Sequence, residues 1–153
     1  MKRMILFFVI VILIMNACQN TQQNKTNPIE KITNVENLNP DEVVKLYFES
    51  WNDKQYNVMY SLISDGFKQI EPTAKTFNEF ATNIEKFYDT SSGVRVLKAN
   101  EAYKNDKEAG VEYTIEIANK DGTKKEFSSI YTLKKRASGW KLIHPYGKNI
   151  DTN

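Results

Sequence analysis

The hydrophobic residues of this chain change their spacing once, close to residue 93, and this change limits the fold more than any other feature. Between Asn39 and Tyr88, apolar and aromatic residues recur three or four positions apart, as in amphipathic helices. From Val94 to His144 they alternate with polar residues, as in half-buried strands. Helices first and an antiparallel meander last predict an α+β domain.

Three helices are expected in the first part. Asn39 can cap the first one, with Pro40 at its first position and a face of apolar and aromatic residues up to Trp51. A second, short helix follows from Tyr56 and is expected to stop at Asp65-Gly66. The stretch 67–71 precedes Pro72 and is interpreted as a short edge strand.

The third helix begins at Thr76, whose capping box is completed by Glu79. Beyond Gly93 the alternation predicts four strands, over 94–103, 111–117, 127–133 and 140–144. The large side chains at the buried phase of these elements form the predicted core or its pocket lining: Tyr47, Phe48, Trp51, Phe80, Ile84, Phe87, Val111, Tyr113, Ile115, Tyr131, Leu133, Trp140 and Leu142.

Two segments of the sequence resemble a known superfamily. They are Asn-Pro-Asp-Glu-Val-Val-Lys-Leu-Tyr-Phe-Glu-Ser-Trp-Asn (39–52) and Tyr-Thr-Leu-Lys-Lys followed by Gly-Trp-Lys-Leu-Ile (131–143). Together with the order of the elements they resemble NTF2-like domains. The resemblance implies a cone in which N-terminal helices pack on a strongly curved antiparallel sheet of four or more strands, over residues 39–146. It implies a fold and leaves the chemistry open.

The N-terminal segment is typical of an export signal. Lys2 and Arg3 precede twelve apolar residues, Met4 to Met15, whereas a membrane-spanning helix needs about twenty. The run ends at Asn16-Ala17-Cys18, which holds the only cysteine of the chain. This arrangement resembles the lipobox of prokaryotic lipoproteins and implies a signal peptide over 1–17 and lipidation of Cys18. A signal anchor, or a cleaved signal with an unrelated cysteine, is the alternative.

The next segment, residues 18–38, is rich in Gln, Asn and Thr and has no aromatic residue. Such a composition buries too little apolar surface to offset its ordering entropy, so it predicts a flexible tether spanning on the order of 25 Å. Residues 39–146 then form the domain and 147–153 a short tail. The predicted location is the extracytoplasmic side of a cell membrane, inner or outer, with Cys18 as the anchor.

Charge and cysteine content exclude several classes of function. Removing residues 1–17 takes away Lys2 and Arg3 and leaves 19 basic and 19 acidic residues. Nucleic-acid binders usually carry a basic stripe, so this balance argues against nucleic acid as a partner. One cysteine allows no intramolecular disulfide, and one histidine with one cysteine makes no usual zinc site. Neither a metal nor a cofactor motif is present, because glycine-rich phosphate loops and nucleophile elbows are missing.

Acid–base catalysis has one remaining candidate, His144, with Tyr113, Tyr131 or Tyr47 as its partner. His144 stands beside Pro145 at the end of the last strand, which favours a structural or exposed position at the rim. Glu112 and Glu116 fall on the polar phase of their strand and are expected on a solvated face. Because no acidic residue occupies a predicted core position, the sequence favours a protein that is not an enzyme.

The aromatic residues allow two interpretations, a filled core or an amphipathic pocket inside the cone. Both phases of 127–133 mix apolar and polar residues, which suits a strand with a pocket on one face and a partner, such as a second copy, on the other. Lys134-Lys135-Arg136 is interpreted as a solvated turn. The candidate pocket lining comprises Tyr47, Trp51, Tyr60, Tyr113 and Tyr131.

These observations predict a non-catalytic envelope lipoprotein that binds a small apolar molecule or an envelope protein. The alternative is a small-molecule isomerase or hydrolase, similar to ketosteroid isomerase, that uses His144 and a pocket tyrosine.

The lipid anchor is testable through Cys18. We expect Cys18→Ala to abolish incorporation of radiolabelled palmitate and to release the protein from washed membranes, because no other thiol can accept the lipid. Labelling and membrane fractionation of cells expressing each form measure both effects. A Cys18→Ala protein that stays fully membrane-bound would contradict the prediction.

Overall fold

The structure, a computed structural model, describes residues 35–145. The predicted signal peptide 1–17, Cys18 and the tail 147–153 lie outside the described residues. The described elements follow in this order: η2 (Val35–Asn37), α2 (Pro40–Asn52), α3 (Tyr56–Leu62), α4 (Asp65–Ile70), η3 (Pro72–Ala74), α5 (Phe77–Glu85), α6 (Phe87–Thr90), β1 (Ser91–Lys104), β2 (Glu108–Asn119), β3 (Lys124–Arg136) and β4 (Gly139–Leu142).

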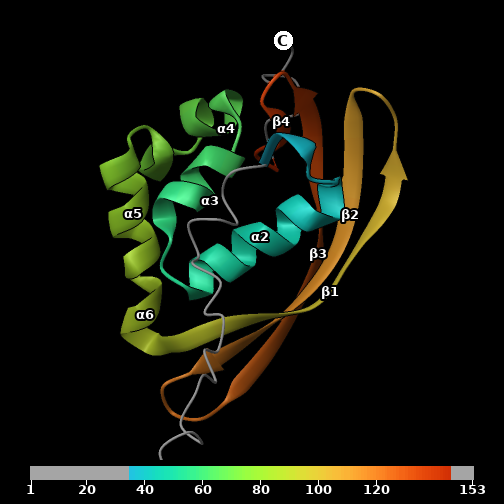
Figure 1. The fold of residues 1–153 in the computed structure, drawn as a ribbon. Coiled ribbons are helices and arrows are strands. Elements are labelled where there is room, and N and C mark those ends of the chain that lie inside the picture. The colour runs from blue at the N-terminus through green and yellow to red at the C-terminus, as the bar shows by residue number, and fades with distance from the viewer. Residues whose placement is uncertain (1–34, 146–153) are drawn as a thin grey trace, which may run out of the picture. The chain divides into compact units, whose positions relative to one another are not determined.

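Four antiparallel strands in the order β1-β2-β3-β4 form one curved sheet, and the helices lie on one side of it (Figure 1). Helix α2 lies directly on the sheet, mainly against β1, and α3 and α5 form a layer beyond it. The predicted α+β architecture with helices on a curved antiparallel sheet is therefore confirmed.

Helix α2 begins where the sequence signals predicted. The Asn39 N–H donates to the Glu42 carboxylate at 2.7 Å, and Pro40 stands at the first helical position, where no backbone donor is required. Its sheet-facing stripe includes Val43, Val44 and Phe48, all of which are fully or almost fully buried. Burial of this stripe, at roughly 25 cal/mol per Å² of apolar surface, holds the helix in the concave face.

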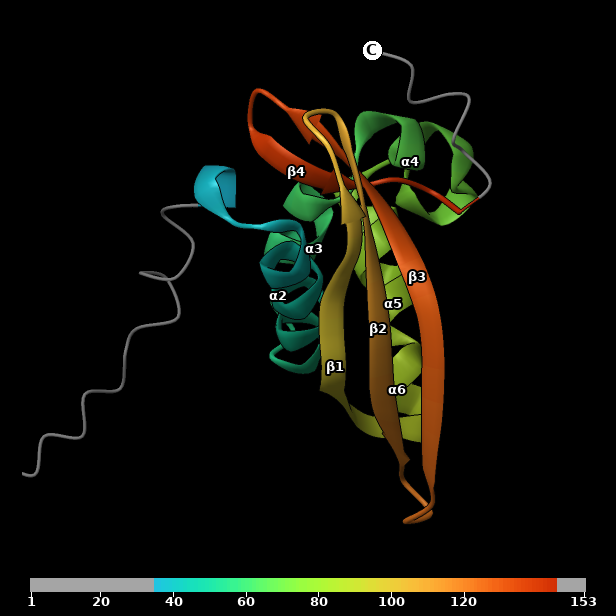
Figure 2. The same ribbon diagram turned by 90° about the vertical axis from the view of Figure 1, so that its right-hand side faces the viewer.

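Strand lengths differ along the sheet. β2 and β3 pair from Glu108↔Lys134 to Ala118↔Lys124, whereas β4 pairs only with Leu133 to Arg136 (Figure 2). The β3–β4 connection requires glycine, because Gly139 has φ of +96° and its Cβ would lie 2.9 Å from the Glu36 backbone. Within the described chain, the part of β3 from Lys124 to Tyr131 has no further strand beside it.

The segment after α3 corrects two predictions. The glycine stop at Asp65-Gly66 was wrong, because α3 ends at Leu62 and Asp65 begins α4. The edge strand over 67–71 was also wrong, because the Ser64 hydroxyl accepts a hydrogen bond from the Phe67 N–H at 3.0 Å and caps a helix there. A helix of less than two turns shows no clear hydrophobic period, so this cap was the only signal for it.

The predicted core is confirmed. Nine of its residues are buried, and Trp51, Ile84, Phe87 and Tyr131 are partly buried and pack against them. The strongest addition is the end of α3, where Met59, Leu62 and Ile63 are fully buried. Residues 35–38 of the predicted tether are described: η2 lies here, and Val35 and Leu38 pack on the core. Among residues 35–145, no helix is long and apolar enough to cross a membrane.

A substitution at Leu142 tests the packing between the sheet and the helices. Leu142 is fully buried, pairs with Leu133 and forms a parallel bridge with Ile63. We expect Leu142→Ala to lower the free energy of unfolding by about 2–5 kcal/mol, through lost burial and a cavity. The matched change Leu97→Ala, at a residue that is 41% exposed, should alter it by less than about 0.5 kcal/mol. Urea unfolding followed by circular dichroism measures both, and equal losses would contradict the assigned burial.

Candidate functional site

An aromatic cluster occupies the space between α2 and the sheet. Phe48 lies at its centre, with ring centroids 5.0 Å from Tyr113, 6.0 Å from Tyr131 and 6.2 Å from Trp51. We define the aromatic cluster as Tyr47, Phe48, Trp51, Phe87, Tyr113, Phe127 and Tyr131.

Helical spacing and strand register bring these rings together. Residues 47, 48 and 51 share one face of α2, and alternate residues of a strand share one face of the sheet. Tyr113 lies opposite Ser129, and Tyr131 lies opposite Val111, so the two tyrosines are diagonal neighbours. Their rings stack with centroids 4.9 Å apart and an interplanar angle of 18°.

The tyrosine hydroxyls in the cluster are buried together. Burial raises the pKa of Tyr47 far above its ordinary value, and the nearby Tyr113 adds to this shift. Burial also raises the pKa of Tyr131, while the Tyr113 hydroxyl is hydrogen-bonded to Ser129 and Tyr131. These hydroxyls stay neutral at physiological pH, so they can donate and accept hydrogen bonds but cannot act as bases.

The cluster is closed at α2 and opens along β3. Phe127 contacts Tyr113 at 6.2 Å on the concave face, yet 53% of its surface is exposed. This exposure follows from the short β4, because this part of β3 pairs with β2 on one side and has no described strand on the other. Trp51 adds an indole N–H that is buried and has no hydrogen-bond partner among the described residues. An orphaned buried donor costs about 1–3 kcal/mol and therefore calls for an explanation.

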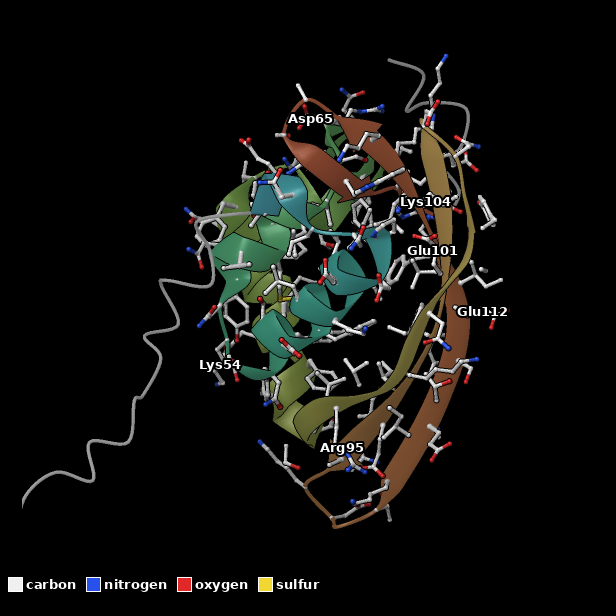
Figure 3. All side chains as sticks on the ribbon, turned by 45° about the vertical axis from the view of Figure 1, so that its right-hand side comes forward. Lys54, Asp65, Arg95, Glu101, Lys104 and Glu112 are labelled. Carbon is white, nitrogen blue, oxygen red and sulfur yellow. The ribbon has the colours of Figure 1, made fainter. Side chains whose placement is uncertain are left out.

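Carboxylates lie on the other face of the sheet, as the alternation predicted. Glu112 pairs with Lys98 at 3.3 Å, and Glu116 pairs with Arg95 at 3.2 Å and Lys124 at 3.1 Å. Figure 3 shows Arg95 and Glu112 on the sheet. The residues of β2 that share the phase of Tyr113 carry no acid: Ala109, Val111, Ile115 and Ile117. The described residues contain no group of three or more potential metal-binding side chains of His, Cys, Asp or Glu.

His144 is buried, with only 9% of its surface exposed, which agrees with a structural role and differs from an exposed rim position. Its Nε2 lies 3.4 Å from the Glu71 carboxylate, and its ring packs edge-on against Phe67 with centroids 5.0 Å apart. Hydrogen bonds from Thr73 lower the pKa of Glu71, and His144 contributes a smaller share. These contacts place His144 against α4 and the turn that follows it.

Four of the five predicted lining residues meet in the aromatic cluster: Tyr47, Trp51, Tyr113 and Tyr131. Tyr60 lies elsewhere, between α3 and α5, where it contacts Phe80 at 5.4 Å and Phe77 at 5.8 Å. Sequence reasoning missed Phe127 as a site residue. Counting the register across the hairpin turn at 119–122 would have placed it opposite Ile115.

Comparison with known proteins establishes the fold. No protein-family model matches the sequence, and the curated proteins contain no match. A solved SEC-C motif containing protein from Rhodopseudomonas palustris is similar with a TM-score of 0.53 at 10% identity, over 69% of this chain and 75% of that one. A cystatin-like protein of unknown function from Nostoc punctiforme has a TM-score of 0.50 at 13% identity, over 70% and 90%.

The fold is a cystatin-like α+β cone. A ketosteroid isomerase-like protein from Erwinia carotovora atroseptica is also similar, with a TM-score of 0.47 at 16% identity, over 67% of this chain and 86% of that one. Identities this low show the fold alone, and the solved neighbours are of unknown or varied function.

The buried tyrosines predict a loss of stability in alkali. Their pKa values are raised in the folded state, so above about pH 10 the unfolded chain releases protons that the folded chain retains, and the free energy of unfolding falls. Each such tyrosine contributes up to about 1.4 kcal/mol per pH unit. We expect Tyr47→Phe to make this fall less steep, measured by urea unfolding at pH values above 10. An unchanged slope would show that Tyr47 ionises in the folded protein.

Proposed function

We propose that this chain is a lipoprotein anchored through Cys18 on the extracytoplasmic side of a prokaryotic cell membrane, and that its cone is a non-catalytic binding module for a small apolar molecule. The basic, apolar and small-residue order of 1–18 supports the anchor. The aromatic cluster supports the binding role, and the observation that carries it is the exposed Phe127 ring beside a cluster whose other members are buried or partly buried.

The chemistry of the cluster selects the class of ligand. Stacked and edge-on aromatic rings offer large apolar area with few rotatable bonds, which suits a flat, mainly apolar molecule. Ser129 and the Tyr131 hydroxyl lie on the same face as Phe127 and supply polar contacts. An acceptor oxygen on the ligand could also accept a hydrogen bond from the Trp51 N–H, which would offset the free-energy cost of burying that donor without a partner.

The same geometry argues against catalysis in the cone. Proton transfer near neutral pH needs a group whose pKa lies near the working pH, but burial raises the pKa of Tyr47 and Tyr131 away from it. The isomerase or hydrolase alternative depends on His144, whose identified contacts are Glu71 and Phe67.

The outer sheet face is another surface on which an envelope protein or a second copy could dock. That face carries Arg95, Lys98 and Lys124, each already paired with a glutamate of the same sheet. Internal pairing and solvation make it a less favourable docking surface than the aromatic cluster. The exposed Ile130 lies on this face.

The binding role is testable with two matched tryptophan variants. We expect Trp51→Phe, which removes the unpartnered N–H and keeps an aromatic ring, to weaken binding of naphthol by about 3–10-fold. Phe127→Ala should weaken it further, through lost contact area. Trp140→Phe, in a buried residue on β4, is the control and should leave the affinity unchanged. Titration calorimetry of the purified full chain measures each affinity.

Native mass spectrometry of gently purified protein provides an independent check. A retained small molecule in the unmodified protein, lost from Phe127→Ala, supports the proposal. The proposal fails if no molecule is retained and the affinity for naphthol is the same in all variants.

A further inference from the structure

A hollow lies away from the aromatic cluster, where the α3–α4 junction faces the β3–β4 turn. Its volume is about 630 Å³, and its lining contains the cationic residues Lys68, Arg136 and Lys141, one acidic residue, Asp65, and the serines Ser61, Ser64 and Ser138. We call it the basic hollow. Figure 1 shows α4 and β4 at the same end of the domain, and Figure 3 shows Asp65 there.

Backbone contacts between distant segments build the basic hollow. The Ser64 N–H donates to the Leu142 carbonyl at 2.8 Å, and Ile63 forms a parallel bridge with Leu142. This bond fixes the α3–α4 junction beside β4 and so places Lys68 near Lys141. The tight turn between Arg136 and Gly139 brings the Arg136 side chain to the same hollow. The cations therefore come from three elements held by one hydrogen-bonded junction.

The charges of Lys68 and Lys141 in the basic hollow are only partly compensated. The Lys141 ammonium donates to the neutral Ser61 carbonyl at 2.7 Å, which leaves two of its three donor hydrogens. Burial lowers the pKa of Lys141, and the nearby charge of Lys68 lowers it further, against the opposite effects of Asp65 and Glu36. Asp65 pairs with Lys68 at 3.1 Å, but its side chain is 90% exposed, so solvent screens this pair.

We propose that the basic hollow binds a phosphate group, either as the free ion or as a phosphate monoester. A tetrahedral dianion can accept charge-assisted hydrogen bonds from two ammonium groups and the planar guanidinium of Arg136, and the Ser138 hydroxyl lies in the same lining. The volume exceeds that of the phosphate and leaves room for the organic part of a monoester. This site is separate from the aromatic cluster and does not depend on the function proposed for it.

The first experiment compares two pairs of charge-removing substitutions in the full chain, purified in a neutral detergent. Lys68→Gln with Lys141→Gln removes two cations from the basic hollow, and Lys98→Gln with Lys125→Gln removes two from the sheet. We expect phosphate to bind the unmodified protein and the control pair with a similar dissociation constant, on the order of 0.1–1 mM, and the Lys68/Lys141 pair at least about tenfold more weakly. Titration calorimetry with sodium phosphate measures this.

Lysine footprinting keeps the proposal testable if the double variant does not fold. Phosphate should slow acetylation of Lys68 and Lys141 in the unmodified protein and leave Lys98 and Lys125 unaffected, as read by mass spectrometry of peptides. Equal weakening in both double variants, or equal protection of all four lysines, would show unspecific charge attraction and overturn the proposal.

Two sources of the phosphate group are distinguished by reconstituting the full chain into phosphatidylcholine vesicles. Protection of Lys68 and Lys141 by phosphatidic acid in the vesicle, without added phosphate, assigns the site to a lipid headgroup. Protection only by soluble phosphate or glycerol phosphate assigns it to a free solute. Protection by neither overturns the proposal.

Discussion

Burial of α2 in the concave face of the sheet is the interaction on which the rest of the domain depends. Val43, Val44 and Phe48 lose almost all contact with water there, and apolar burial of this kind is the main favourable term in folding. The same contact removes Tyr47 from solvent, which raises its pKa and keeps its hydroxyl neutral. The packing of α2 on the curved sheet thus contributes to the stability of the domain and also keeps the interior tyrosine hydroxyls neutral.

The short fourth strand determines which part of the β3 edge is exposed. β4 pairs only with the last four residues of β3, so Phe127 and the strand around it remain open at the edge. Open edges invite pairing with other chains, and Lys124, Lys125 and Glu126 place charges at the exposed end of this one. The last residue of β4, Leu142, contacts the α3–α4 junction, and this contact assembles the basic hollow. The two proposed sites therefore lie at opposite ends of β3.

The two proposed sites differ in the interactions that would bind their ligands. The aromatic cluster offers apolar area with neutral hydroxyls, so its ligand gains mainly from burial. The basic hollow offers charge and hydrogen-bond donors at a partly solvated surface, so its ligand must carry negative charge. The two proposed sites therefore call for ligands of different chemistry, and the two affinities can be measured separately.

Sequence alone determined the helical and alternating segments, the Asn39 cap, the Thr76 capping box, the core and the solvated face of β2, because each depends on local spacing or on caps within one turn. Four of the five lining residues predicted from the sequence lie together in the structure. Tertiary structure decided the remainder. The α4 helix, the position of Phe127, the burial of His144 against Glu71 and the meeting of Lys68, Arg136 and Lys141 depend on strand register and on contacts between segments far apart in the chain. Periodicity carries no information about such contacts, so Lys134-Lys135-Arg136 could be interpreted only as a solvated turn until the fold placed Arg136 beside the basic hollow.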